Sequence, residues 1–192
     1  MMGPIPVTDL KQWAYCARVV YYHRVLPGAG QATWKMREAL AAQDMIERLE
    51  MRRGLREYGW EGAGRRFGLW LADEGLGLNG KLDLLLVREG EGAVVDFKLT
   101  SGEMGDNHRM QLSGYAVLVE AALGLRVNTA FMYRIPDDRV FEFVVTEAWK
   151  RRVSEAVRAI RELQETAWCP EATAVRARCA ECEYVNYCGD VW

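Results

Sequence analysis

Gly80-Lys81-Leu82-Asp83-Leu84-Leu85-Leu86-Val87 and Ala93-Val94-Val95-Asp96-Phe97-Lys98-Leu99 are two apolar runs on either side of the turn Glu89-Gly90-Glu91-Gly92. This pattern predicts two strands joined as a hairpin. Side chains alternate between the two faces of a strand, so we expect Leu82, Leu84 and Leu86 on one face and Asp83 on the other. In the second strand Asp96 and Lys98 share a face, and Phe97 points away. The hairpin would bring Asp83 and Asp96 close together.

Two buried carboxylates repel each other unless a cation lies between them, and a divalent ion together with Lys98 would supply that charge. Oxygen ligands of this kind hold Mg²⁺ or Mn²⁺, which activates a bound water and stabilises charge on a phosphate. Lys98 would orient the water or neutralise the developing negative charge. The pattern therefore favours phosphodiester hydrolysis. The alternative is a structural Asp–Lys pair on the surface of a sheet.

A helix is expected directly after these strands, and it carries His108, Gln111 and Tyr115 at intervals of three and four residues. This spacing places the three side chains on one helix face. A polar and aromatic row beside a metal site is suited to holding the phosphate or base of a nucleotide. The alternative is that Tyr115 packs in the core and Gln111 hydrogen-bonds to the backbone.

The rest of the chain predicts helices around a central sheet of mixed direction, which is the α/β class with one core. The residue patterns indicate strands over 66–72, 78–87, 93–99, 129–135 and 140–145. They indicate helices over about 8–22, 33–58, 106–123 and 147–168, with Thr8 or Asp9 capping the first of them.

Three cysteines form a C-x2-C-x5-C motif at Cys179, Cys182 and Cys188, and Cys16 stands near the other end of the chain. Such closely spaced thiolates cannot all pair with one another, but they can converge on one metal centre. Four thiolates would satisfy either zinc or an iron–sulfur cluster. Cys169 competes with Cys16 as the fourth ligand because it is nearer in sequence.

The composition excludes several classes of protein. The chain has 192 residues, of which 50% are apolar, and its net charge of -2 excludes a uniformly basic nucleic-acid binder. The N-terminus lacks the pattern of a secretory signal. The longest apolar run, 110–125, is too short and too polar to span a bilayer, so we expect a cytoplasmic protein without a membrane partner.

Gly80-x2-Asp83, Asp96-Phe97-Lys98 and Gln111-x3-Tyr115 resemble the motifs of RecB-like nucleases, which belong to the P-D-(D/E)-x-K superfamily. The cysteines narrow the resemblance to the iron–sulfur members, and the size resembles the CRISPR-associated exonuclease of the spacer-acquisition module. The resemblance implies a restriction-endonuclease-like core and a single domain over 1–192. Within that domain, 33–145 would form the nuclease core, and 1–30 and 165–192 would form the cluster segments.

The resemblance also implies an activity and roles for individual residues. The activity is trimming of single-stranded DNA ends or overhangs, dependent on Mg²⁺ or Mn²⁺, for spacer acquisition together with the CRISPR integrase. Asp83, Asp96 and the Phe97 carbonyl would bind the metal, Lys98 would be catalytic, and Gln111 and Tyr115 would place the DNA. Cys16, Cys179, Cys182 and Cys188 would hold a 4Fe-4S cluster.

One position departs from the family pattern. The family carries G-x3-H on its long helix, where the histidine binds the metal, and the counterpart here is Ala39-x3-Gln43. Gln43 would be the ligand, although an amide oxygen binds Mn²⁺ more weakly than imidazole does. His108 is a candidate replacement. The departure motivates an alternative, a catalytically attenuated subunit that binds DNA ends. A DNA-repair nuclease outside CRISPR is a further alternative.

Overall fold

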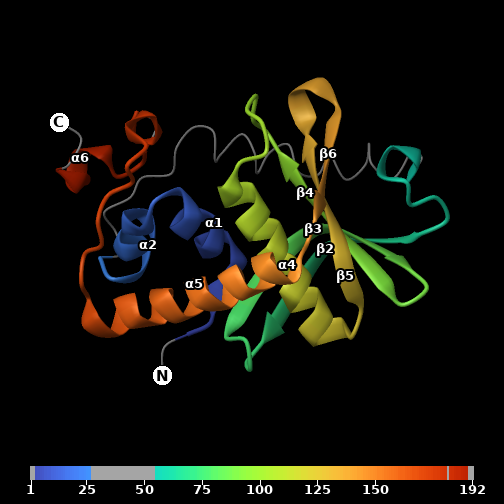
Figure 1. Ribbon diagram of the computed structural model, residues 1–192, viewed down its shortest axis with the longest axis horizontal. Coiled ribbons are helices and arrows are strands. Elements are labelled where there is room, and N and C mark those ends of the chain that lie inside the picture. Colours follow the sequence, from blue (N-terminus) through green and yellow to red (C-terminus); the bar gives the residue numbers. More distant parts are fainter. Residues whose placement is uncertain (1–2, 27–54, 181, 190–192) are drawn as a thin grey trace.

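The chain folds around a six-stranded mixed sheet with helices packed against it (Figure 1). The computed structural model describes residues 3–26, 55–180 and 182–189. The strand order is β1-β3-β4-β5-β6, and β2 pairs with β3. The pairs β1/β3 and β4/β5 are parallel, and the other pairs are antiparallel. The predicted α/β class with a central mixed sheet is confirmed.

The strands are β1 (Ile5–Pro6), β2 (Gly64–Asp73), β3 (Leu78–Arg88), β4 (Glu91–Lys98), β5 (Arg126–Arg134) and β6 (Arg139–Val144). Within residues 3–26, 55–180 and 182–189, the helices are α1 (Val7–Tyr15), α2 (Ala17–Arg24), α4 (Asp106–Leu123), α5 (Glu147–Thr166) and the short α6 (Val185–Cys188). The same residues include the 3-10 turns η1 (Leu55–Tyr58), η2 (Ile135–Asp137) and η3 (Arg176–Cys179). Within the described residues, no helix is long and apolar enough to cross a bilayer.

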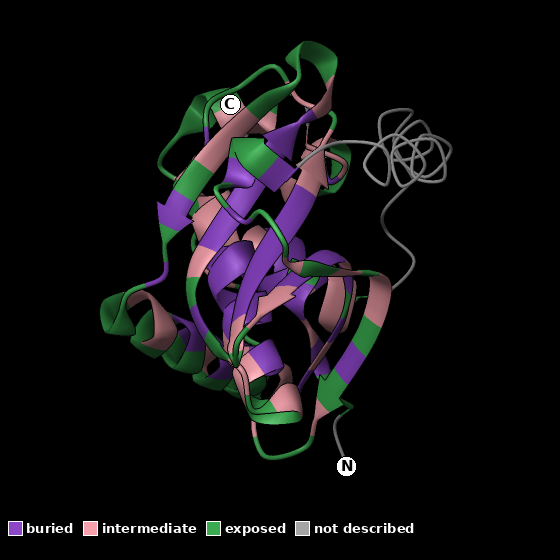
Figure 2. Cartoon of the chain, turned by 90° about the vertical axis from the view of Figure 1, so that its right-hand side faces the viewer, coloured by how far each residue is buried: buried purple, intermediate pink, exposed green. Residues whose placement is uncertain are grey.

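Apolar side chains form a core on each side of the sheet. The larger core lies between the sheet and helices α1, α4 and α5, and includes Leu82, Leu85 and Val94. The second core lies on the opposite face and includes Leu84, Leu86 and Val95 with Tyr58. Figure 2 shows buried residues running along the central strands. Period-two alternation in β4 explains why Val94 and Val95 join different cores.

The hairpin of β3 and β4 opens into a fork at the two acids. Backbone pairing runs from Arg88 opposite Glu91 to Leu84 opposite Val95, and it ends there. Asp83 and Asp96 would form the next pair, so their side chains lie where the strands separate. A split between two strands frees backbone groups and makes room for polar side chains between buried leucines. The predicted approach of the two acids is explained by this fork.

The prediction that Leu82, Leu84 and Leu86 share one face is wrong at Leu82. Leu82 belongs to the core under the helices, whereas Leu84 and Leu86 belong to the opposite core. The neighbouring strand changes face at the same level, because Leu69 and Phe67 also pack against different cores. Gly68 lies between them with φ +56°, a conformation that favours glycine. The two strands therefore change face together at Asp83.

The predicted helix over 8–22 is two helices, broken at Cys16. Cys16 is extended, with φ -164° and ψ 118°, and it ends α1 and precedes α2. Its N–H donates to the Gln12 carbonyl at 2.7 Å, and its carbonyl accepts from Val19 N–H at 3.1 Å. Neither Thr8 nor Asp9 caps the helix, because α1 begins at Val7 after Pro6. The chain therefore changes direction at Cys16, the residue whose thiol is predicted to be a metal ligand.

Most of the predicted helix over 33–58, including Ala39 and Gln43, lies outside the described residues. Its last part is described as the 3-10 turn η1, Leu55–Tyr58. The other helices agree closely with prediction, since α4 spans 106–123 and α5 spans 147–166.

Candidate functional site

The fork between β3 and β4 brings together four polar side chains, those of Asp83, Asp96, Lys98 and Gln111. The Phe97 N–H donates to Asp83 Oδ2 at 2.9 Å, which joins the two strands where their ladder ends. Lys98 Nζ lies 2.6 Å from Asp96 Oδ2. Gln111 Nε2, from α4, donates to Asp96 Oδ1 at 3.2 Å. Asp96 is only 3% exposed, so its charge depends on these partners.

The electrostatics of this group call for an additional cation. Burial, together with the neighbouring charge of Asp96, raises the pKa of Asp83 to about 7. The Phe97 N–H and the charges of Lys98 and Lys81 oppose that shift only in part. A divalent ion between the acids would remove the repulsion. The side-chain oxygen of Gln111 is buried without a hydrogen-bond partner among the described residues, and it is suited to a water bound to such an ion.

Lys11 is a further cation at this site, and sequence reasoning missed it. Burial and repulsion by Lys98 lower the pKa of Lys11 to about 8, although Asp96 opposes the change. Lys11 belongs to α1, which packs on α4. No pattern in the sequence predicts that Lys11 lies beside the acids, because the helix expected over 8–22 is connected there only with the cysteine centre.

Tyr115 and His108 fix α4 over the sheet. Tyr115 is 3% exposed, and its hydroxyl donates to the Lys81 carbonyl at 2.8 Å. His108 Nδ1 accepts from the Gly105 N–H at 3.3 Å and so closes the first turn of α4. Burial and the charges of Lys11 and Lys98 lower the pKa of His108 to about 4. The imidazole is therefore neutral at pH 7.

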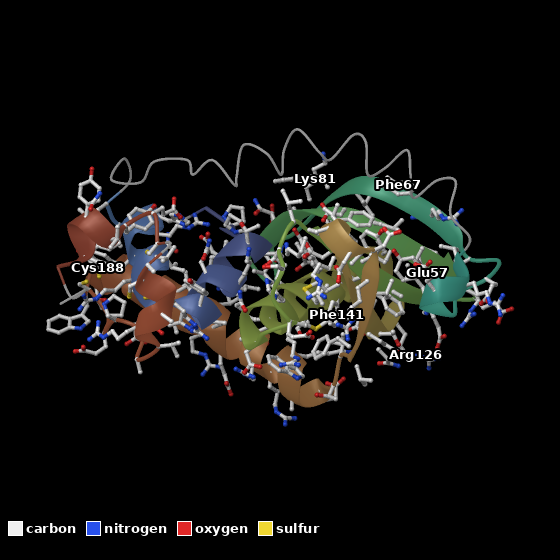
Figure 3. The ribbon with its side chains drawn as sticks, turned by 90° about the horizontal axis from the view of Figure 1, so that it is seen from above. Glu57, Phe67, Lys81, Arg126, Phe141 and Cys188 are labelled. Carbon is white, nitrogen blue, oxygen red and sulfur yellow. The ribbon has the colours of Figure 1, made fainter. Side chains whose placement is uncertain are left out.

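Four cysteines line one cavity at one end of the molecule, away from the fork. They are Cys16, Cys179, Cys182 and Cys188, and the cavity opens to solvent. Figure 3 shows Cys188 at one end of the long dimension and Lys81 near its middle. Cys169 is exposed, and its thiol lies 3.8 Å from the Pro170 carbonyl. The structure thus places Cys16, and not Cys169, among the cavity residues.

The Cys182 thiol in this cavity ionises less readily than an ordinary thiol. Burial raises the pKa of Cys182, and the charges of Cys16, Cys179 and Cys188 add to the increase. In the described part of the chain, no three cysteine, histidine, aspartate or glutamate side chains are arranged to hold a single metal ion. Four cysteine thiolates that line one pocket are a donor set used by both zinc and iron–sulfur clusters.

Comparison with known proteins identifies the family. Residues 7–189 match the PD-(D/E)XK nuclease superfamily. The chain belongs to this superfamily. It is 27% identical to the CRISPR-associated exonuclease Cas4 of Francisella tularensis subsp. novicida (strain U112), over 97% of this chain and 94% of that protein. It is 25% identical to CRISPR-associated exonuclease Cas4 of Aeropyrum pernix, over 95% and 94%. The expected resemblance to CRISPR-associated RecB-like nucleases is confirmed.

Another relative and two solved structures extend the comparison. A CRISPR-associated exonuclease Cas4/endonuclease Cas1 fusion of Myxococcus xanthus (strain DK1622) is 30% identical, over 91% of this chain and 29% of the fusion. The crystal structure of SSO0001 has a TM-score of 0.59 at 19% identity, covering 100% of this chain and 88% of that one. An alkaline exonuclease from Laribacter hongkongensis has a TM-score of 0.54 at 12% identity, covering 86% and 89%. These two structures share the overall fold of this chain.

In this chain, Gly80 of the Gly-x2-Asp motif allows two helices to pack closely against β3. A Cβ at Gly80 would lie 2.9 Å from Tyr115 Cε1 and 3.3 Å from Val7 Cβ. The absence of a side chain lets α4 and α1 approach β3 just before Asp83. We expect Gly80→Ala to lower the free energy of unfolding by about 1–3 kcal/mol, measured by chemical denaturation. Gly64→Ala, whose Cβ would meet only Val87 O at 3.8 Å, is the control. Equal losses in both variants would contradict this packing role.

The cysteine region is held to the N-terminal helices by an ion-paired histidine. His23 Nδ1 lies 3.5 Å from Asp9 Oδ1, and His23 Nε2 lies 3.4 Å from Glu183 Oε1. The hydrogen bond to Asp9 raises the pKa of His23, although burial opposes it. Protonation of His23 therefore joins α1 to the residue after Cys182.

This bridge predicts a pH dependence with a definite sign. Because the folded pKa of His23 is raised, its contribution is complete below the unfolded value of about 6.5 and is lost as pH rises through the folded value. We expect the stability difference between wild type and His23→Gln, about 1 kcal/mol at low pH, to shrink across that range. Thermal unfolding of both proteins over a pH series measures it. Parallel pH curves for the two would contradict the bridge.

Proposed function

We propose that the chain is a metal-dependent DNA exonuclease that trims single-stranded ends or overhangs of DNA fragments for CRISPR spacer acquisition. The observation that carries this proposal is the fork at which the half-buried Asp83 lies beside the buried Asp96 and Lys98 is paired at 2.6 Å with Asp96. A structural Asp–Lys pair needs only one acid. The second acid, Asp83, with its raised pKa, favours a metal-binding role.

The residues present fit a divalent ion. Asp83, Asp96 and the Phe97 carbonyl would hold Mg²⁺ or Mn²⁺, with Gln43 as a further ligand that lies outside the described residues. When bound, the ion would activate water and stabilise charge on the phosphate. Gln111 holds Asp96 through its amide nitrogen and presents its oxygen for a water. Tyr115 acts indirectly, because its hydroxyl is bound to the Lys81 backbone and keeps α4 in place.

The lysines would act on the substrate by charge. Lys98 would turn from Asp96 toward the attacking water or the phosphate once the metal neutralises the acids, and its ammonium would stabilise the pentavalent transition state. Lys11 adds a second, largely desolvated positive charge close by, which favours a phosphate over a neutral ligand. This arrangement supports hydrolysis of a polyanionic strand such as DNA.

We propose that Cys16, Cys179, Cys182 and Cys188 hold a 4Fe-4S cluster that joins the two ends of a single nuclease domain. The cavity that these four cysteines share supports this ligand set. Bound cluster would supply the positive charge that the thiolates need and would link α1 and α2 to the C-terminal segment. Its role here is structural.

The proposed partner is the CRISPR integrase. One relative is a fusion of an exonuclease Cas4 to an endonuclease Cas1, and this chain corresponds to only part of it. A fusion in one species supports a physical association of separate chains in another. We propose that the trimmed fragments pass directly to the integrase.

The deciding experiment is anaerobic purification with analysis of iron, sulfide and zinc, followed by a nuclease assay on the same sample. Substrates labelled at the 5′ or 3′ end, as single strands or as duplexes with overhangs, would be incubated with Mg²⁺, Mn²⁺ or a chelator. We expect stepwise shortening of single-stranded ends that requires the metal. Intact DNA under all conditions would contradict the exonuclease, and zinc without iron would contradict the cluster.

Gln43 favours a second candidate, a subunit that binds DNA ends but cuts them poorly. An amide supplies a weaker ligand than imidazole, so the attenuated form predicts that Gln43→His increases the cleavage rate at limiting Mn²⁺ by about tenfold or more. A titration of rate against Mn²⁺ for both proteins measures this. An unchanged rate in the variant would argue against attenuation, and Gln43→Ala shows whether the amide contributes at all.

A further inference from the structure

One of the four cavity sulfurs differs from the others in its hydrogen bonding. Arg18 Nη1 lies 3.4 Å from Cys188 Sγ and 3.3 Å from the Cys188 carbonyl. Arg18 Nε donates to the Pro170 carbonyl at 2.7 Å. Arg18 lies in α2, two residues after Cys16, and reaches a partner 170 positions away in sequence. The Arg18 guanidinium therefore binds the C-terminal segment at two positions, Pro170 and Cys188, and at Cys188 it contacts both the carbonyl and the sulfur.

A second side chain of α2 reaches the same segment. The hydroxyl of Tyr22, one turn further along α2, donates to the carbonyl of Tyr187, the residue before Cys188, at 3.3 Å. Burial raises the pKa of Tyr22, so its hydroxyl stays protonated and remains a donor at neutral pH. The α2 side chain that donates to the Cys188 sulfur is therefore Arg18.

Hydrogen bonds to a thiolate ligand change the electronic properties of an iron–sulfur centre. Reduction adds negative charge that is shared by the ligand sulfurs, so a donor at the sulfur stabilises the reduced form more than the oxidised form. A cationic donor does so more strongly than a neutral one. Loss of such a donor lowers the reduction potential and leaves the sulfur more exposed to exchange.

We propose that Arg18 is a positioning residue for the cluster, which orients the Cys188 thiolate and raises the reduction potential of the centre through its N–H···S bond. The inference rests on the proposed 4Fe-4S cluster. It means that a side chain of α2 influences the oxidation state of a centre whose other role is to join the two ends of the chain. No substrate or additional cofactor is required. The property that Arg18 sets is an equilibrium between two oxidation states.

Arg178 provides a matched control for this role. It also lines the cavity, and it also carries a positive charge. In the described part of the chain its guanidinium binds the carbonyls of Tyr15 at 2.6 Å and Ala14 at 3.4 Å, and it lies over the Tyr15 ring. Arg178 therefore ties the same segment to α1 through backbone oxygens. Its replacement tests docking and local charge without removing the bond to sulfur.

The experiment is an anaerobic redox titration of full-length wild type, Arg18→Gln, Arg18→Lys and Arg178→Gln, followed by electron paramagnetic resonance of the reduced cluster. At the wild-type midpoint, we expect the ratio of reduced to oxidised cluster to fall about tenfold in Arg18→Gln, as for loss of one hydrogen bond to a charged group. The ratio in Arg18→Lys should lie between those of wild type and Arg18→Gln. Arg178→Gln should stay within about twofold of wild type but should unfold at a lower temperature.

The outcomes separate the inference from the proposal on which it depends. A wild-type midpoint in Arg18→Gln that retains its cluster would overturn the role of Arg18, as would equal shifts in Arg18→Gln and Arg178→Gln. If Arg18→Gln assembles no cluster, Arg18→Lys carries the measurement, and an unshifted midpoint there has the same meaning. Wild-type protein with zinc and no acid-labile sulfide would instead overturn the cluster itself, and the inference with it.

Discussion

Replacing Lys98 by alanine is expected to reduce metal-dependent DNA cleavage by about 10²–10⁴-fold. Lys98 is the cation nearest to the buried acids, with its Nζ 2.6 Å from Asp96 Oδ2, and it also opposes the raised pKa of Asp83. Without the Lys98 ammonium, no lysine at this position stabilises the negative charge that develops on the phosphate or orients the attacking water. Single-turnover cleavage of an end-labelled single strand measures the loss.

The loss must be separated from unfolding and from weaker DNA binding. Lys98→Ala leaves a buried carboxylate without its ion-pair partner, so thermal unfolding is measured in parallel. DNA affinity is measured with Ca²⁺ in place of Mn²⁺. The control is Lys150→Ala, which removes a comparable ion pair, 2.7 Å from Glu120, on the far side of α4. Equal cleavage by wild type and a folded Lys98→Ala would remove Lys98 from the reaction.

Most of the fold was predictable because its main signals are local. The alternating and apolar runs around Gly90 predicted the hairpin, and α4 has the bounds that its pattern indicated. The change of face at Asp83 was not predictable, because it depends on two strands that depart together from regular geometry at Gly68. The break at Cys16 was also missed. Its residues have ordinary helical composition, and the extended conformation is imposed by packing against the C-terminal segment.

The site was predictable where residues act through neighbours in sequence. Asp83, Asp96 and Lys98 lie on one hairpin, and Gln111 follows on the next helix, so spacing alone predicted their encounter. Lys11 and Arg18 could not be found in that way, since each meets its partners across long stretches of chain. Tyr115 was assigned to DNA from its position beside Gln111. Its buried hydroxyl, bound to Lys81 O, indicates a supporting role.

Replacing Cys16 by serine is expected to abolish cluster assembly and to cause the largest loss of stability of any single change outside the core. Cys16 is the only one of the four cavity cysteines that comes from the N-terminal helices. A cross-link from Cys16 to Cys179 closes a very long loop, and in the chain-entropy model closure of a loop of about 100 residues stabilises the fold by about 4–5 kcal/mol. Iron and sulfide per chain, and thermal unfolding under anaerobic conditions, measure both effects.

Cys169→Ser is the matched control, because it removes a thiol of the same C-terminal segment that does not line the cavity. We expect this variant to keep its iron and its melting temperature. Retained iron in Cys16→Ser together with lost iron in Cys169→Ser would transfer the fourth ligand to Cys169 and would leave α2 without a covalent tie to the centre. The remaining attachment would then include Arg18, His23 and Arg178, whose hydrogen bonds and ion pairs hold the same two segments together. Proteolysis of the segment after Thr166 distinguishes these cases, since protection that depends on iron requires the cluster to bridge both ends of the chain.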